Sequence, residues 1–130
     1  MRMFLRAVIC SVLVALISVF GASAVSAGGG PLSGTWESTD WDGSSQHLRI
    51  TGSGQGSYAM FLVDEGASAC GGSPAAAVGS GVVHDDTLTM FATLTCRPGG
   101  NFLSGRLTVD FVYSPATDTL TDQLGVTWYR

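Results

Sequence analysis

Apolar and polar residues alternate through most of the chain after residue 33, and this period of two indicates β-strands rather than helices. Over residues 87–96 every second residue from Leu88 is apolar, and the residues between are threonine except for Phe91. Residues 106–113 repeat the pattern. Such alternation is typical of strands with one face in the core and the other in solvent.

Glycine, proline and aspartate clusters divide this region into short strands. We expect strands at residues 34–39, 46–51, 57–64, 76–84, 87–96, 101–113, 118–121 and 126–130. The break at residues 122–125 separates eight strands from seven, and its Asp-Gln-Leu-Gly sequence fits a four-residue turn. The pattern predicts an all-β antiparallel up-and-down meander, closed as a small barrel or packed as a sandwich.

The first 27 residues have the order of features of a secretory signal peptide. Two arginines precede an apolar run at residues 7–20, and small residues follow to Ala27. A membrane-spanning helix needs about 20 apolar residues, so the run is short for an anchor and we favour cleavage. We expect cleavage after Ala27, with Ala24 as the alternative, giving a secreted or periplasmic domain at residues 34–130. Residues 28–33 would be a flexible leader.

The processed chain is acidic, with ten acidic residues against four arginines and no lysine, which gives a net charge of −6. Nucleic-acid backbones and anionic membrane surfaces attract clustered Lys and Arg, so neither is an expected partner. We also expect no stable membrane insertion after cleavage. A small molecule or a protein partner remains open.

Cleavage would remove Cys10 and leave Cys70 and Cys96. Two cysteines in an exported chain most often form one disulfide bond, with free thiols as the alternative. The bond would close a loop of about 25 residues and contribute on the order of 3 kcal/mol.

No group of residues in the sequence forms a recognisable catalytic site, so we expect no enzyme, no metal and no cofactor. Residues 40–44 resemble the start of a calcium loop but lack its later ligands, and a hairpin turn explains them. Asp64 and Glu65 are adjacent, which on a strand points them to opposite faces rather than to one acid–base site. His47 and His84 have no partner ligands nearby in the sequence.

The opening Leu32-Ser33-Gly34-Thr35-Trp36 and the terminal Trp128-Tyr129-Arg130 resemble the signature of lipocalin-like (calycin) barrels. The resemblance implies a small calycin-like barrel of bacterial exported type, in which Arg130 packs over Trp36 and closes the narrow end. That pairing requires an even number of strands. In such barrels the opposite end is the mouth that admits ligand.

Strand direction in an eight-stranded meander brings Cys70 and Cys96 to this opposite rim. The rim also collects the turn at 122–125 and the candidate ligand-binding residues, which are Trp41, Asp64, Glu65 and Arg97. The interior positions are mostly bulky, which favours a filled barrel over a large pocket. Small residues at 75–81 would leave room near the rim.

We therefore expect a non-enzymatic binding module that takes a small molecule or an envelope component at the disulfide-bearing rim. Trp41 would be the apolar anchor. One alternative is an exported protease inhibitor of the small G-x-W barrel type, inserting residues 28–33 into an enzyme cleft. Another is a structural or assembly module that uses an outward apolar patch, unless the loop at 65–74 covers it; the patch residues are Phe61, Phe91, Phe102 and Val112.

Overall fold

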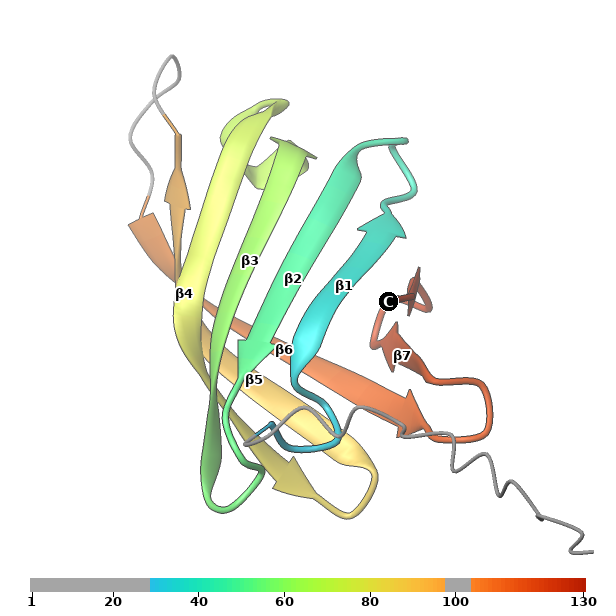
Figure 1. Ribbon diagram of the computed structural model, residues 1–130. Coiled ribbons are helices and arrows are strands. Elements are labelled where there is room, and N and C mark those ends of the chain that lie inside the picture. Colours follow the sequence, from blue (N-terminus) through green and yellow to red (C-terminus); the bar gives the residue numbers. More distant parts are fainter. Residues whose placement is uncertain (1–28, 98–103) are drawn as a thin grey trace, which may run out of the picture.

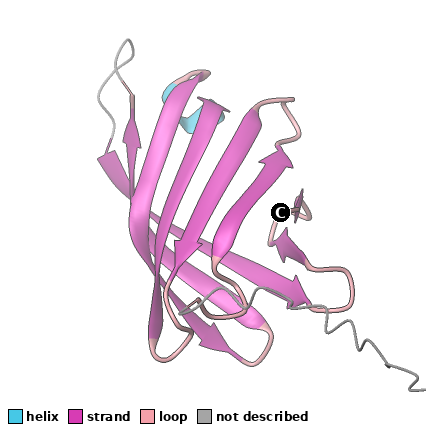
Figure 2. Cartoon of the chain, in the orientation of Figure 1, coloured by secondary structure: helices cyan, strands magenta, loops and turns pink. Residues whose placement is uncertain are grey.

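The computed structural model describes residues 29–97 and 104–130, which form one antiparallel sheet of eight strands in sequence order. The sheet curls into a nearly closed barrel (Figures 1 and 2), and the only helical element in the described ranges is one short 3₁₀ turn. The elements are β1 (Gly34–Thr39), β2 (Ser45–Thr51), β3 (Ser57–Ala67), η1 (Ser68–Cys70), β4 (Ser73–His84), β5 (Thr87–Cys96), β6 (Ser104–Ser114), β7 (Thr119–Asp122) and β8 (Thr127–Trp128).

The alternating pattern therefore predicted the fold class correctly, and the strand bounds differ from expectation mainly at strand ends. β3 runs three residues beyond the expected end because a register shift between Asp64 and Ala67 lets pairing with β4 resume at Ser73. The last strand is shorter than expected, because only Thr127 and Trp128 pair with β7. Residues 101–103, which we expected to begin a strand, and the expected signal peptide lie outside the described residues.

The predicted turn at residues 122–125 is present and is what makes the strand count eight. The backbone N–H of Asp122 donates to the Val126 carbonyl at 3.0 Å, and Gly125 takes a φ of 83° that favours glycine. The sheet closes where β1 meets the end of the chain, through two backbone hydrogen bonds between Glu37 and Tyr129 of 2.7 and 2.9 Å. Figure 1 shows the C-terminus beside β1. The strands thus form a single curled sheet and not the two-sheet sandwich that the sequence also allowed.

The inward residues of the strands form a single core inside the barrel. Trp36, Leu48, Ile50, Leu88, Met90, Phe111 and Leu120 are completely buried. Two aromatic pairs meet edge to face: Trp36 with Tyr113 at 6.3 Å between ring centroids, and Phe111 with Trp128 at 5.8 Å. This geometry is favourable for aromatic rings.

Arg130 closes one end of the barrel, as the sequence resemblance implied. Its guanidinium carbon lies 4.3 Å from the centroid of the Trp36 ring. The same group donates to the carbonyls of Pro31 (3.0 Å) and Ser33 (3.1 Å) and makes a two-pronged contact with the Asp118 carboxylate. Hydrogen bonding from Arg130 lowers the pKa of Asp118 below its ordinary 3.8, and hydrogen bonding to Asp118 raises the pKa of Arg130.

The described part of the expected leader packs against this closed end. The Leu32 side chain is buried in the core, and its carbonyl accepts a hydrogen bond of 3.0 Å from the Trp36 indole. Gly30 donates its backbone N–H to the Gly52 carbonyl at 2.6 Å. Residues 30–33 are thus packed against the closed end of the barrel.

Two of the small residues in β4, Gly79 and Gly81, do not leave the free space that we expected from the sequence. A Cβ added at Gly81 would collide with the Met60 sulfur and come within 2.7 Å of a Leu88 methyl, so those side chains already fill the space. At Gly79 an added Cβ would collide with the Phe91 carbonyl and lie 2.6 Å from the Ala92 Cα. The two glycines permit close packing between strands, and the free volume lies elsewhere.

In the part of the chain that the structure describes, no helix is long and apolar enough to span a membrane.

Candidate functional site

The end of the barrel opposite Arg130 carries the disulfide bond between Cys70 and Cys96, whose Cα atoms are 5.5 Å apart. β3 and β5 run in the same direction, so η1 and the end of β5 reach the same rim. The bond ties these two ends together. The predicted pairing and its place on this rim are therefore confirmed.

A cavity of about 240 Å³ opens at this rim. Its apolar wall consists of Leu62, Ala67, Ala69, Leu94, Leu107, Val109, Phe111 and Trp128, and its polar lip consists of Asp40, Gln46, Asp64, Ser68, Asp122 and Gln123, with Leu124 beside them. Drug-sized ligand pockets have volumes of about 300–1,000 Å³, so this one suits a smaller molecule.

The bulky interior predicted from the sequence is thus packed at one end and hollow at the other. The three inward residues Leu94, Leu107 and Val109 are only partly buried, and all three line the cavity. On the neighbouring strand β4 the inward residues near the rim are Ala75 and Ala77, which are completely buried. These two alanines do not line the cavity, so the space at the mouth is bounded by the medium-sized side chains of β5 and β6.

Asp64 is the most buried carboxylate on the lip. Its side chain is only 8% exposed, and it accepts hydrogen bonds from the Ser44 hydroxyl (3.0 Å), the Gly66 backbone N–H (2.9 Å) and the Gln46 amide (3.3 Å). The register shift after Asp64 is what brings the Gly66 N–H back to it. These donors fix one orientation of a carboxylate at the cavity lip.

Asp122 holds the other side of the lip. One carboxylate oxygen accepts from the backbone N–H groups of Leu124 (2.9 Å) and Val126 (3.0 Å), and the other accepts from the Trp128 indole at 3.2 Å. The β7–β8 turn is therefore built around this carboxylate. It also joins the lip to Trp128 in the cavity wall.

The four predicted site residues occupy different positions relative to the cavity. Asp64 lines it, whereas Trp41 lies just outside, 78% exposed, in a neighbouring hollow that shares Asp40, Ser68 and Leu124 with the lip. Glu65 and Arg97 are exposed and do not line the cavity.

Sequence reasoning missed Gln46, Asp122 and Trp128 as lining residues. The signal was available for Asp122, since its turn was assigned to this rim. Trp128 was considered only as a core residue at the C-terminus, and its contact with Asp122 depends on the tight turn between them.

The turn at residues 40–44 is a hairpin, as expected. Gly43 donates to the Asp40 carbonyl and Ser44 donates to the Asp42 carboxylate, each at 2.9 Å. Hydrogen bonding from Ser44 lowers the pKa of Asp42. Within residues 29–97 and 104–130, no three His, Cys, Asp or Glu side chains come together as a metal site.

The two histidines lie away from the cavity. His47 is 3.6 Å from the Glu37 carboxylate, and His84 is 3.1 Å from that of Asp85. Neither residue lines the cavity.

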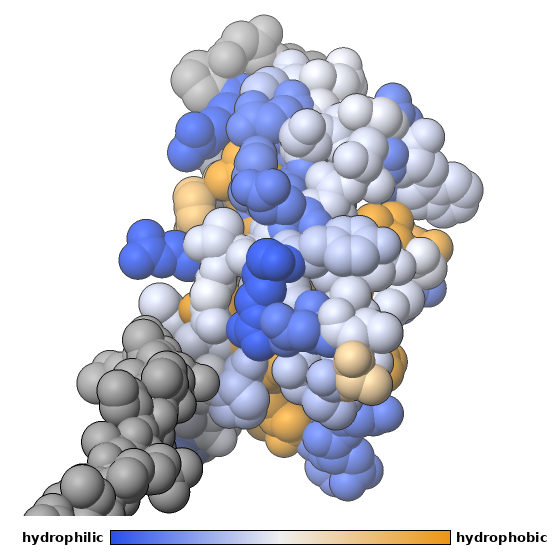
Figure 3. Space-filling view, turned by 45° about the vertical axis from the view of Figure 1, so that its right-hand side comes forward, coloured by the Kyte–Doolittle hydropathy of each residue, from blue (hydrophilic) through white to orange (hydrophobic). Residues whose placement is uncertain are grey.

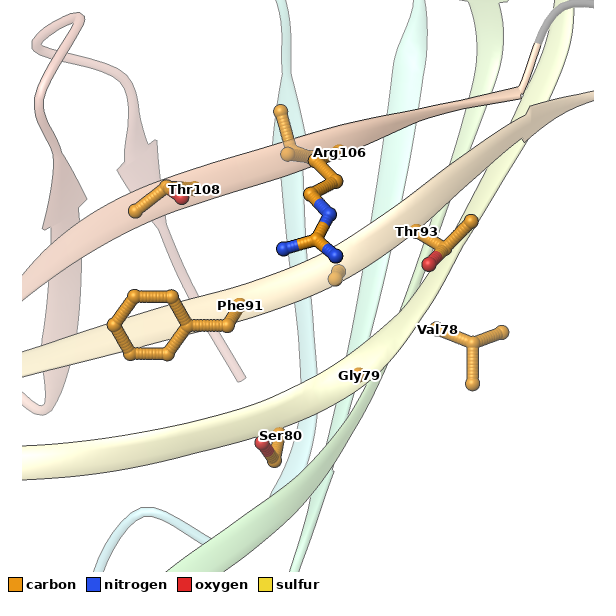
Figure 4. A pocket seen from close by; sticks show the side chains of 9 residues that line it. Val78, Gly79, Ser80, Phe91, Thr93, Arg106 and Thr108 are labelled. Atoms are coloured by element: carbon orange, nitrogen blue, oxygen red, sulfur yellow. The ribbon is translucent and has the colours of Figure 1, made fainter.

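A second hollow of about 460 Å³ crosses the outer faces of β4, β5 and β6. Figure 4 shows Phe91, Arg106 and Thr108 along it, with Val78, Gly79 and Ser80 on the adjoining strand. It is open to solvent, since Phe91 is 53% exposed and Val78 60% exposed. It offers a shallow surface rather than an enclosed site.

The outward parity predicted for Phe61, Phe91 and Val112 is confirmed by their exposure, and the chain at 65–74 does not cover them. Phe102 lies outside the described residues. Another face of the molecule, in Figure 3, shows separate apolar patches among polar side chains.

Comparison with protein-family models, with curated proteins and with solved structures gives no match.

Proposed function

We propose that this protein is an exported, non-enzymatic binding module that takes a small molecule at the disulfide-bearing rim. The observation that carries the proposal is the cavity of about 240 Å³, with apolar walls and an ordered polar lip. Such a combination of apolar walls and a few placed polar groups is typical of small-molecule sites. Trp41 extends the apolar surface beside the entrance.

The closed end supports a calycin-like architecture for the module. Arg130 stacks on Trp36 and holds the carbonyls of Pro31 and Ser33, and the cavity opens at the other end. The disulfide bond is compatible with an oxidising compartment outside the cytoplasm. A secreted or periplasmic location after signal-peptide cleavage therefore belongs to the same proposal.

The inhibitor alternative receives less support. Its inserting segment would be residues 28–33, yet Pro31 and Ser33 bind Arg130 and Leu32 is buried. An insertion into an enzyme cleft would have to break these contacts. For the assembly alternative, the described outer face offers exposed apolar side chains but no specific contact.

A matched pair of substitutions on β6 tests the binding proposal. Val109 lines the cavity, whereas Val112 points outward and is 45% exposed, so Val109→Phe fills the cavity and Val112→Phe adds the same group outside. The probe is 1-octanol, and the readout is the NMR resonance of the Trp128 indole N–H in the cavity wall. We expect saturable shifts in the processed wild-type protein and in Val112→Phe, and none in Val109→Phe.

Circular dichroism and urea unfolding establish that both variants are folded. Octanol binding that survives Val109→Phe, or shifts confined to residues of the outer face, would contradict the proposal.

A further inference from the structure

We infer that the ligand of this cavity is a small amphiphilic amine, with a protonated amino group at the lip and an apolar body inside. This inference rests on the proposed binding function and adds the chemical class of the ligand. It is argued from the size of the cavity, the character of its walls and the charges at its lip.

The cavity limits the apolar body to a short chain or a single ring. At about 30 Å³ per water-sized group, a volume of about 240 Å³ holds roughly eight such groups. Leu62, Leu107 and Phe111 on the walls offer contact surface but no hydrogen bonds. The inner part of the ligand is therefore hydrocarbon.

The lip carries three carboxylates, those of Asp40, Asp64 and Asp122. Every hydrogen bond that the structure records to them comes from a neutral donor: hydroxyl, amide, indole or backbone N–H. In residues 29–97 and 104–130 the ion pairs involve His47, His84 and Arg130, none of which lines this cavity. The charge at the lip is oriented but not neutralised.

The arginines of the described residues do not compensate this charge. Arg130 is bound to Asp118 at the opposite end, and Arg49 and Arg106 line other hollows. Arg97, on the same rim, is exposed and not part of the lining. Oriented carboxylates beside an apolar space repel an anionic head group and attract a cationic one, because a charge next to a low-dielectric wall is weakly screened. Hydrogen bonds between an ammonium group and a carboxylate are also among the stronger ones.

The geometry of Asp64 gives the preference a specific centre. Its side chain is more than nine-tenths buried and is held by Ser44, Gln46 and Gly66, so it needs little reordering to accept a further donor. A carboxylate accepts up to about four hydrogen bonds, and Asp64 receives three from the protein. An ammonium group at the lip supplies the fourth.

Three probes with the same chain length separate this inference from the proposed function: octan-1-amine, 1-octanol and octanoate. Alkylamines stay protonated at neutral pH, as lysine does. Each probe is titrated into the processed protein while the Trp128 indole N–H is followed by NMR. We expect the amine to bind about tenfold more tightly than the alcohol, and octanoate to bind most weakly, because carboxylates at the lip favour the cation.

Asp64→Asn supplies the variant test and Glu65→Gln its control, since Glu65 is the exposed neighbour on the opposite face. Asp64→Asn should bring the amine to the affinity of the alcohol, while Glu65→Gln keeps the preference. Because Asp64→Asn also disturbs the lip, the wild-type protein is titrated at low and high salt; the amine preference should fall as salt rises.

Equal affinity of the amine and the alcohol in the wild-type protein, or tighter binding of octanoate, would overturn the inference and leave the binding proposal standing. Binding of none of the three probes would overturn both. A preference for the amine that persists in Asp64→Asn and at high salt would place its cause outside the lip, against the inference.

Discussion

Arg130 makes contacts that tie together three separate stretches of chain. Its guanidinium stacks on Trp36 and donates to two carbonyls in residues 31–33 and to the Asp118 carboxylate in the β6–β7 turn. Arginine suits this position because its planar guanidinium can stack on an aromatic ring and donate several hydrogen bonds at the same time, which the lysine ammonium group cannot do. Asp118 itself has a φ of 52°, a left-handed conformation that Asp and Asn tolerate better than other non-glycine residues.

Asp118→Asn is predicted to lower the free energy of unfolding by about 1 kcal/mol or less at neutral pH, the range for partly exposed ion pairs. The change removes the charge and retains the backbone preference of the turn. Urea unfolding measures the effect. Asp85→Asn is the matched control, because Asp85 also has a left-handed φ, of 56°, but its ion pair is with the exposed His84 rather than with an arginine.

The stabilisation from Asp118 is predicted to disappear in acid. Hydrogen bonding from Arg130 lowers the pKa of Asp118 in the folded protein below its ordinary 3.8. A carboxyl with a lowered folded pKa stabilises above its unfolded pKa, and this contribution is lost as pH falls through the folded value. The difference in stability between wild type and Asp118→Asn should thus be constant from about pH 7 to pH 5 and shrink below about pH 4. A difference that grows in acid would contradict this assignment.

The sequence allowed some of these residue roles to be predicted and not others. The Arg130–Trp36 contact followed from a family resemblance at the two ends of the chain. Asp118 carries no comparable signal, because the sequence does not show which residue of the turn after Pro115 takes the left-handed φ. Asp64 was identified as a rim residue by counting strand directions, and alternation along β3 places it on the inward side with Met60 and Leu62. Its hydrogen bond from Gly66, however, depends on a register shift that alternation alone does not reveal.

At the scale of single elements, β4 is the strand most constrained by its small residues. Its glycines allow the backbone of β5 and the side chains of Met60 and Leu88 to approach closely. The run of small residues was visible in the sequence. Whether these small residues leave a cavity or allow neighbouring groups to pack closely depends on which residues lie opposite them, and strand register determines that.

Gly81→Ala and Gly79→Ala are predicted to differ in severity. At Gly81 the collision is with the mobile ends of Met60 and Leu88, so the cost should be about 1–3 kcal/mol, as for overpacked cores. At Gly79 it is with the backbone of Phe91 and Ala92, which cannot move without shifting β5, so the cost should be larger. Urea unfolding gives the order. Gly105→Ala, where an added Cβ meets nothing within 4 Å, is the control.

At the scale of the whole molecule, the barrel is packed at the Trp36 end and hollow at the disulfide end. The fold class and strand count were predictable because alternation and turn residues are local signals. The cavity was not, because the list of inward residues gives side-chain volumes but not the width of the barrel at each level. Three inward residues of β5 and β6 prove too small to fill the mouth: Leu94, Leu107 and Val109.

Removing the disulfide bond is predicted to lower the free energy of unfolding by about 3 kcal/mol, the chain-entropy value for a loop of this size. Cys70 and Cys96 are 26 residues apart. The double variant Cys70→Ser, Cys96→Ser is compared with the oxidised wild type by urea unfolding. A loss well below this value would show that the unfolded chain is already compact in this loop.

The order of strands in the sheet also bears on how the chain assembles. Every strand pairs with its neighbour in sequence, so seven pairings form between consecutive strands. Joining β1 to Tyr129 must instead bring together residues 92 positions apart in sequence, Glu37 and Tyr129, and loop-closure entropy grows with that separation. Folding by successive hairpins, with the β1–β8 seam closing last, follows from this meander, and non-local pairings of that kind are the slow ones.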